Sequence, residues 1–167
     1  MTPFPVGLSS PGKRLSSTRE NRDAVRLMAI IAEHHLRGFA RYTPRDVTGD
    51  GINETWCNLF AQDVCEAMGV MLPRNSRAND LVRWLELDSK QWDWEAVPAH
   101  VAQRMADEGQ LALVVWHNPA GPGHIAVLVP SLGEPDYFCA QAGRVNFTRG
   151  TVSQGFGGRV VSYFAHP

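Results

Sequence analysis

The sequence has few cysteines, no excess of charge of one sign and no long apolar run. Cys57, Cys65 and Cys139 form no C-x-x-C pair, which excludes a disulfide scaffold and the common zinc and thiol-redox motifs. The 16 basic residues are balanced by 17 acidic ones, which argues against a nucleic-acid binder built on a basic face. Apolar runs such as residues 111–116 are far too short to cross a bilayer, so we expect no membrane insertion.

The composition is that of a folded domain. Hydrophobic residues make up 44% of the chain and charged residues 20%, which is enough to bury a core. The 167 residues correspond to one domain. Residues 1–20 hold three prolines, two glycines and four serines without periodicity. We therefore expect an extended N-terminal arm over 1–20 and a single domain over 21–167.

Helical patterns come first along the chain and strand patterns follow. Apolar residues recur with helical spacing over four stretches, at 21–38, 57–68, 78–87 and 95–107. After Gly109 the period changes, and short strands are predicted at 111–116, 125–129, 137–141 and 160–164, with a further strand at 144–149. This order indicates an α+β domain with N-terminal helices packed on one side of an antiparallel β-sheet.

Cys57 is the candidate nucleophile. It opens a predicted helix directly after a loop, where the helix dipole and unpaired backbone N–H groups favour a thiolate. We therefore expect a lowered pKa for Cys57, and the same N–H groups are suited to hold an oxyanion. Cys65 lies more than two turns further along the helix, where we expect a packed, inert thiol.

His124 is the candidate general base, because it opens a strand after a glycine-rich turn. A Cys–His pair needs a third polar group to orient the imidazole. Gln141 on the next strand is the preferred candidate, and Asp136 and Asn146 are the alternatives. His117, at the end of the preceding strand, is a rival base.

The residues around this pair resemble a known family. Trp56-Cys57-Asn58-Leu59-Phe60, followed by Met68-Gly69-Val70-Met71-Leu72-Pro73-Arg74, resembles the nucleophile helix and following loop of NlpC-type cell-wall peptidases and the related CHAP amidases. Gly123-His124-Ile125-Ala126-Val127-Leu128 resembles their glycine–histidine strand. Ala78-Asn79-Asp80 is similar to a segment of small peptidoglycan amidases that bacteria inject into rivals.

The resemblance implies a papain-like fold and a cysteine peptidase or amidase that hydrolyses an amide bond in peptidoglycan stem peptides or their cross-links. Cys57 would be the nucleophile, His124 the base and Gln141 the orienting residue, with no cofactor required. The chain departs from the family at Trp56-Cys57-Asn58, where many members have Asp-Cys-Ser. Two alternatives stay open: an inactive papain-like binding or adaptor module, and a papain-like amidase or acyltransferase on a substrate outside the cell wall.

Two further groups of residues have both a functional and a structural interpretation. Trp56, Arg74 and Asn79 are candidates for substrate binding, with arginine suited to stem-peptide carboxylates, although solvation of the surface explains polar loop residues equally well. Asp46, Asp50 and Glu54 have part of the spacing of a calcium loop, but a turn rich in Asp and Gly also explains this stretch.

The N-terminal sequence also carries an expectation about location. The first 15 residues lack a charged start followed by an apolar core, so we expect no Sec signal. A cell-wall hydrolase of this kind would be made in a bacterial or phage-infected cytoplasm. It would reach the periplasm or cell wall by phage lysis, a phage tail or contact-dependent injection. An inhibitor or immunity protein is then an expected partner, besides the stem peptide itself.

Overall fold

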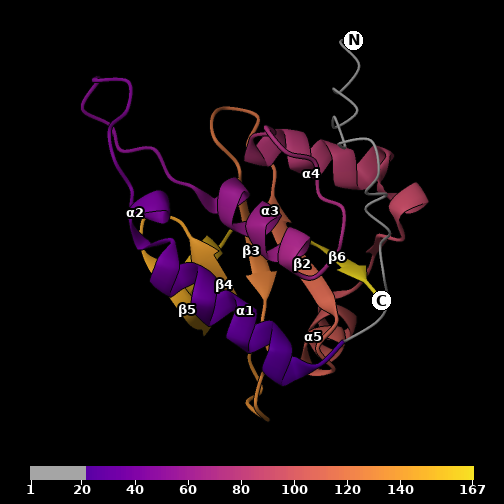
Figure 1. Cartoon of the computed structure of the whole chain (residues 1–167). Helices are drawn as coiled ribbons and strands as arrows, with labels where there is room; N and C mark the ends of the chain where they lie inside the picture. The colour runs from indigo at the N-terminus through magenta and orange to yellow at the C-terminus, as the bar shows by residue number, and fades with distance from the viewer. Residues whose placement is uncertain (1–21) are drawn as a thin grey trace, which may run out of the picture.

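The structure is a computed structural model that describes residues 22–167, so the arm predicted over 1–20 lies outside the described residues. Its centre is an antiparallel sheet of six strands in the order β1-β6-β2-β3-β4-β5 (Figure 1). The strands are β1 (Glu95–Ala96), β2 (Leu111–Trp116), β3 (His124–Leu128), β4 (Phe138–Ala142), β5 (Asn146–Thr151) and β6 (Ser162–His166). The predicted α+β class with an antiparallel sheet is confirmed.

Helices cover both faces of this sheet, so the prediction that they pack on one side is wrong. The helices are α1 (Ala24–Arg37), α2 (Phe39–Tyr42), α3 (Cys57–Ala67), α4 (Ala78–Leu87), the 3-10 helix η1 (Ser89–Trp92), α5 (Ala99–Asp107) and α6 (Val152–Phe156). Side chains of α1, α3 and α4 pack against one face, and α1 and α3 cross in front of the strands in Figure 1. Side chains of α5 and α6 pack against the other face.

The alternation of side chains along each strand explains the two layers. Leu113, Val115, Ile125 and Val127 point toward α3, while Val114 and the other alternate residues point toward α5 and α6. Because both faces are covered, these strands read as continuous apolar runs rather than alternating ones. A sheet covered on one face only would have strands in which apolar and polar residues alternate, and these strands do not alternate in this way.

Element boundaries follow local chemistry. The helix predicted over 78–87 is confirmed as α4, and the helix predicted from 57 begins at Cys57 and ends at Ala67, before Gly69 with φ 74°. The helix predicted from 95 is wrong in its first turn. Pro98 is the N-cap of α5, and Glu95–Ala96 instead forms β1 against β6. The helix α6 was missed, because the glycines near 155–158 indicate a turn.

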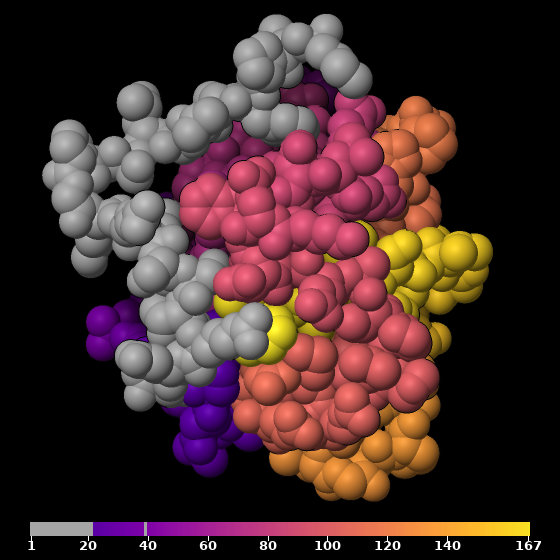
Figure 2. All heavy atoms as spheres, turned by 90° about the vertical axis from the view of Figure 1, so that its right-hand side faces the viewer, coloured from indigo at the N-terminus to yellow at the C-terminus, as the bar shows by residue number. Residues whose placement is uncertain are grey.

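The C-terminal segment reaches the surface between helical regions. Figure 2 shows its yellow atoms bordered by the pink and salmon atoms of the region from α4 to α5. Within residues 22–167, no helix is both long enough and apolar enough to span a membrane.

Gly109 lies in the turn between α5 and β2, and its backbone packs closely against the start of α1. Its φ is +80°, and a Cβ built there would lie 2.1 Å from the carbonyl carbon of Asp23, the N-cap of α1. Gly133 has nearly the same φ, +83°, but a Cβ there meets nothing within 4 Å.

We predict that Gly109→Ala lowers the melting temperature more than Gly133→Ala. Both changes carry the left-handed backbone cost of about 1–2 kcal/mol, but only the first also displaces backbone atoms of α1. Thermal unfolding followed by circular dichroism checks this. Equal losses in the two variants would show that the contact between Gly109 and Asp23 adds nothing to stability.

Candidate active site

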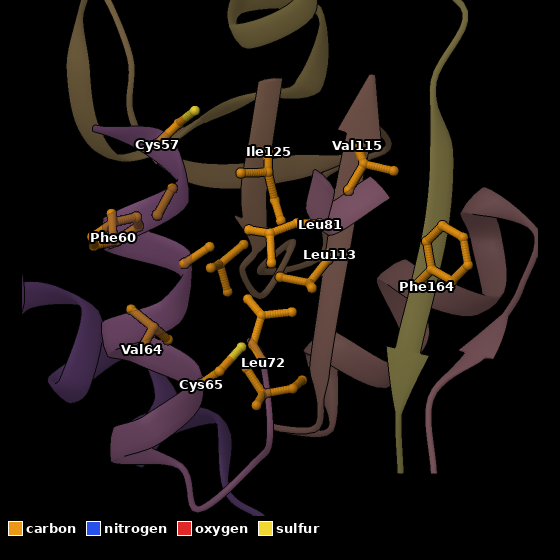
Figure 3. Close-up of a cluster of buried hydrophobic side chains, with 14 of the residues drawn as sticks. Cys57, Phe60, Val64, Cys65, Leu72, Leu81, Leu113, Val115, Ile125 and Phe164 are labelled. Atoms are coloured by element: carbon orange, nitrogen blue, oxygen red, sulfur yellow. The ribbon is translucent and has the colours of Figure 1, made fainter. Parts of the chain in front are cut away.

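Cys57 is the first residue of α3 and is almost fully buried, with 3% of its surface exposed. The N-cap, Trp56, makes no side-chain capping hydrogen bond, so no N-cap side chain occupies the N–H groups of the first turn of α3. Figure 3 shows the sulfur of Cys57 pointing from the end of α3 toward the strand that carries Ile125.

Strands β3 and β4 separate at the place where Cys57 enters. Their pairing joins Leu128 with Cys139 and Val127 with Ala140, continues beyond Leu128 with the hydrogen bond from the N–H of Val129 to the carbonyl oxygen of Phe138, and does not extend to His124. Beyond it, the N–H of Trp56 donates to the carbonyl oxygen of Ala142 at 3.2 Å, which joins the start of α3 to the end of β4. On the other side, the backbone N–H of Ile125 faces the Cys57 thiol. The chain at 56–57 therefore bridges the two strands that carry His124 and Gln141.

Burial raises the pKa of the Cys57 thiol, so the expectation of a lowered pKa is wrong. The backbone N–H groups of Ile125 and Asn58 and the hydroxyl of Thr55 act in the opposite direction, but they offset only part of the cost of burying a thiolate. In the resting site Cys57 is a neutral thiol that needs a base. Burial also raises the pKa of Cys65 to about 12, which agrees with the inert thiol expected there.

His124 and Gln141 lie in direct contact. The Nε2 atom of His124 is 2.7 Å from Oε1 of Gln141. The other end of the Gln141 amide is occupied, because its Nε2 donates to the carbonyl oxygen of Val145 at 2.9 Å. A carbonyl oxygen only accepts, so this arrangement places the proton of neutral His124 on Nε2. Nδ1 is left as the acceptor, which is the state that a general base requires.

The surroundings of His124 keep it neutral. Burial lowers its pKa, the hydrogen bond to Gln141 opposes this effect, and the positive charge of Arg159 adds to it. The ring of Phe156 lies 4.6 Å from the imidazole between ring centroids and shields it from water. Gly155 brings α6 close to Gln141, since a Cβ there would lie 2.7 Å from Oε1. No pattern in the sequence indicated that Phe156 or Arg159 lies near His124.

The thiol and the imidazole do not share a hydrogen bond within the described part of the chain. Cys57 enters from the α3 face, whereas the ring of His124 contacts Phe156 of the α6 face. Proton transfer therefore requires Sγ to reach Nδ1 by a rotation of the side chain or through one water molecule.

The alternatives to His124 and Gln141 lie elsewhere. His117 is exposed in the loop after β2. Asn146 donates to the carbonyl oxygen of Tyr42, and Asp136 lines a separate pocket with Tyr137. None of these three is the partner of His124, so the structure favours Gln141 as the third residue.

Asn79 is not placed for substrate binding, which corrects that prediction. Its Nδ2 donates to the carbonyl oxygens of Asn118 at 2.8 Å and Gly121 at 2.9 Å, and its Oδ1 accepts from the N–H of Asn118 at 3.0 Å. The amide of Asn79 thus ties α4 to the loop that leads into His124. It positions that loop rather than offering free polar groups to a ligand.

Trp56 and Arg74 do line a common pocket of about 470 Å³ beside the start of α3. The ring of Trp56 is fixed by its Nε1, which donates to the carbonyl oxygen of Thr43, and by the guanidinium of Arg45, 4.3 Å from the ring centroid. The remaining lining residues are Arg41, Asn58, Leu59, Gln62 and Asn75. No pattern in the sequence indicated Arg41 or Gln62: Arg41 reaches the pocket from α2, and Gln62 lies on α3 one turn after Asn58.

The candidate calcium loop forms a tight turn. Asp46 accepts from the N–H groups of Gly49 and Gly51, and Asp50 accepts from Ile52. The Glu54 carboxylate accepts from the N–H of Val47 at 2.8 Å. Within residues 22–167, no group of three or more His, Cys, Asp or Glu side chains is gathered as a metal site. The turn explains these carboxylates, and calcium binding stays a prediction.

Comparisons with known proteins do not identify the chain: no family model matches it, and no curated protein matches it.

We predict that Gln141→Glu raises the pKa of His124. A carboxylate in place of the amide stabilises the imidazolium, which opposes the lowering caused by burial. NMR titration of the histidine ring protons measures this shift, with the exposed Gln91→Glu as control. An unchanged or lower His124 pKa in Gln141→Glu would contradict the contact between these two side chains.

Proposed function

We propose that the chain is a papain-like cysteine peptidase or amidase that hydrolyses an amide bond in peptidoglycan stem peptides or their cross-links. The observation that carries the proposal is the bridge at 56–57, which brings a buried thiol at a helix start to the strand of a histidine oriented by an amide. The choice of peptidoglycan rests on the sequence motifs around Cys57 and His124.

The reaction uses the groups in turn. Nδ1 of His124 takes the proton of Cys57, and Sγ attacks the amide carbonyl carbon. The N–H groups in the first turn of α3 and the N–H of Ile125 are the available donors for the oxyanion. His124 then protonates the leaving amine, and water, deprotonated by His124, hydrolyses the thioester. Gln141 keeps the proton on Nε2 throughout.

One observation favours a second candidate, an inactive binding module with the same fold. Cys57 is buried, its pKa is raised and it is not hydrogen-bonded to His124. A binding module in which Cys57 never forms a thiolate would have the same buried thiol and would not hydrolyse its target. The two functions differ in whether the chain releases fragments from its target.

We predict that the purified protein releases peptide fragments from peptidoglycan sacculi under reducing conditions and that Cys57→Ala releases none. Mass spectrometry of the soluble fraction identifies the bond that is cut. Cys65→Ala is the matched control, since Cys65 is a buried thiol on the same helix, and it should retain activity if folded.

Release by both wild type and Cys57→Ala would mean that Cys57 is not the nucleophile. No release by any of the three, with calcium supplied, would overturn the hydrolase and support the binding module or a substrate outside the cell wall.

A further inference from the structure

The pocket beside Cys57 is built around two arginines. It is lined from α2 by Arg41, from the start of α3 by Trp56 and Asn58, and from the following loop by Arg74. Trp56 and Asn58 are the chain neighbours of Cys57, so the pocket lies at the start of α3, where the backbone of Cys57 also lies. Among the residues 22–167 that line it, the two arginines are the charged ones.

A buried carboxylate holds both guanidinium groups in place. Asp63 accepts from Nε of Arg41 at 3.0 Å and from Nη1 of Arg74 at 2.6 Å. It also accepts from the hydroxyl of Tyr42 at 2.5 Å. The charge of Asp63 compensates only one of the two guanidinium groups, and its hydrogen bonds fix both arginines before any ligand arrives.

The loop that carries Arg74 is fixed as well. Nδ2 of Asn58 donates to the carbonyl oxygen of Ser76 at 2.9 Å, and Nε2 of Gln62 donates to that of Pro73 at 2.6 Å. Asn75 has a φ of 58°, a left-handed conformation that asparagine tolerates. The pocket therefore has a rigid wall on the side away from α2.

A second carboxylate approaches Arg74 from the solvent side. The side chain of Glu66 is 61% exposed and pairs with Nη2 of Arg74. An exposed ion pair of this kind contributes little to stability, so an incoming anion can replace it. The Nε of Arg74 and the Nη1 of Arg41 are not used in the contacts with Asp63.

We propose that the pocket between Arg41 and Arg74 binds a carboxylate of the substrate whose scissile amide lies at Cys57. The proposal rests on the proposed function and narrows its substrate class to peptides with a free carboxylate near the cleaved bond. The arginines bind the carboxylate by charge-assisted hydrogen bonds, and the fixed amides of the wall limit where the peptide lies.

The test measures peptide binding to the Cys57→Ala protein by calorimetry. The probes are a stem tetrapeptide from peptidoglycan with free carboxyl groups and the same peptide with those groups amidated. We expect the peptide with free carboxyl groups to bind at least about tenfold more tightly than the amidated peptide. A difference of this size corresponds to the loss of one hydrogen bond to a charged group. Arg41→Gln and Arg74→Gln should each reduce this preference, and Glu66→Gln should increase it.

Arg104→Gln is the control, because Arg104 is exposed on α5, across the sheet from the pocket. It should leave the preference unchanged. The side chain of Arg41 is 54% exposed, so Arg41→Gln keeps the test valid if Arg74→Gln does not fold. Equal affinities for acid and amide, an undiminished preference in Arg41→Gln, or no binding of either peptide would each overturn the proposal.

Failure of the carboxylate pocket is distinguishable from failure of the hydrolase. Digestion of sacculi without a preference for the acid in the binding experiment would overturn the pocket alone. A preference for the acid that depends on the arginines, without digestion, would support the pocket and overturn the hydrolase.

Discussion

The separation of β3 from β4 is the constraint on which the site depends. Their pairing stops at Val127 and Ala140, and the start of α3 occupies the opening, tied by the Trp56 N–H to Ala142. If β3 and β4 were paired along their whole length, the thiol of Cys57 could not lie against the backbone N–H of Ile125. The opening therefore sets both the depth of the thiol and its distance from the strand that carries His124.

Burial at this opening determines the chemistry. It raises the pKa of the Cys57 thiol and lowers that of His124, so each group is neutral at rest. A neutral thiol and a neutral imidazole whose Nδ1 is free to accept are the states from which proton transfer starts, once Sγ reaches Nδ1 directly or through one water molecule. The same burial is why Phe156 and Gly155 matter, since they keep water away from the contact between His124 and Gln141.

The sequence predicted what depends on local pattern. Helical spacing located α3 and α4, and the two-residue period of a strand indicated the face on which Gln141 contacts His124. Burial by the packing of separate elements was not predictable in this way. It raises the pKa of Cys57, whereas the position of Cys57 at a helix start predicted a lowered one. The role of Asn79 and the approach of Arg41 to Arg74 also depend on the packing of separate elements, which no spacing along the chain records.

The pH dependence of Cys57 alkylation tests the central claim most directly, because it needs no substrate. Iodoacetamide labelling is followed by mass spectrometry in wild type and in His124→Ala; Cys65 and Cys139 are fully buried and serve as internal references. If His124 is the base for Cys57, wild type is labelled at pH 7 at least about tenfold faster than the variant. Identical profiles of rate against pH would contradict the account, because the thiol would then ionise without His124.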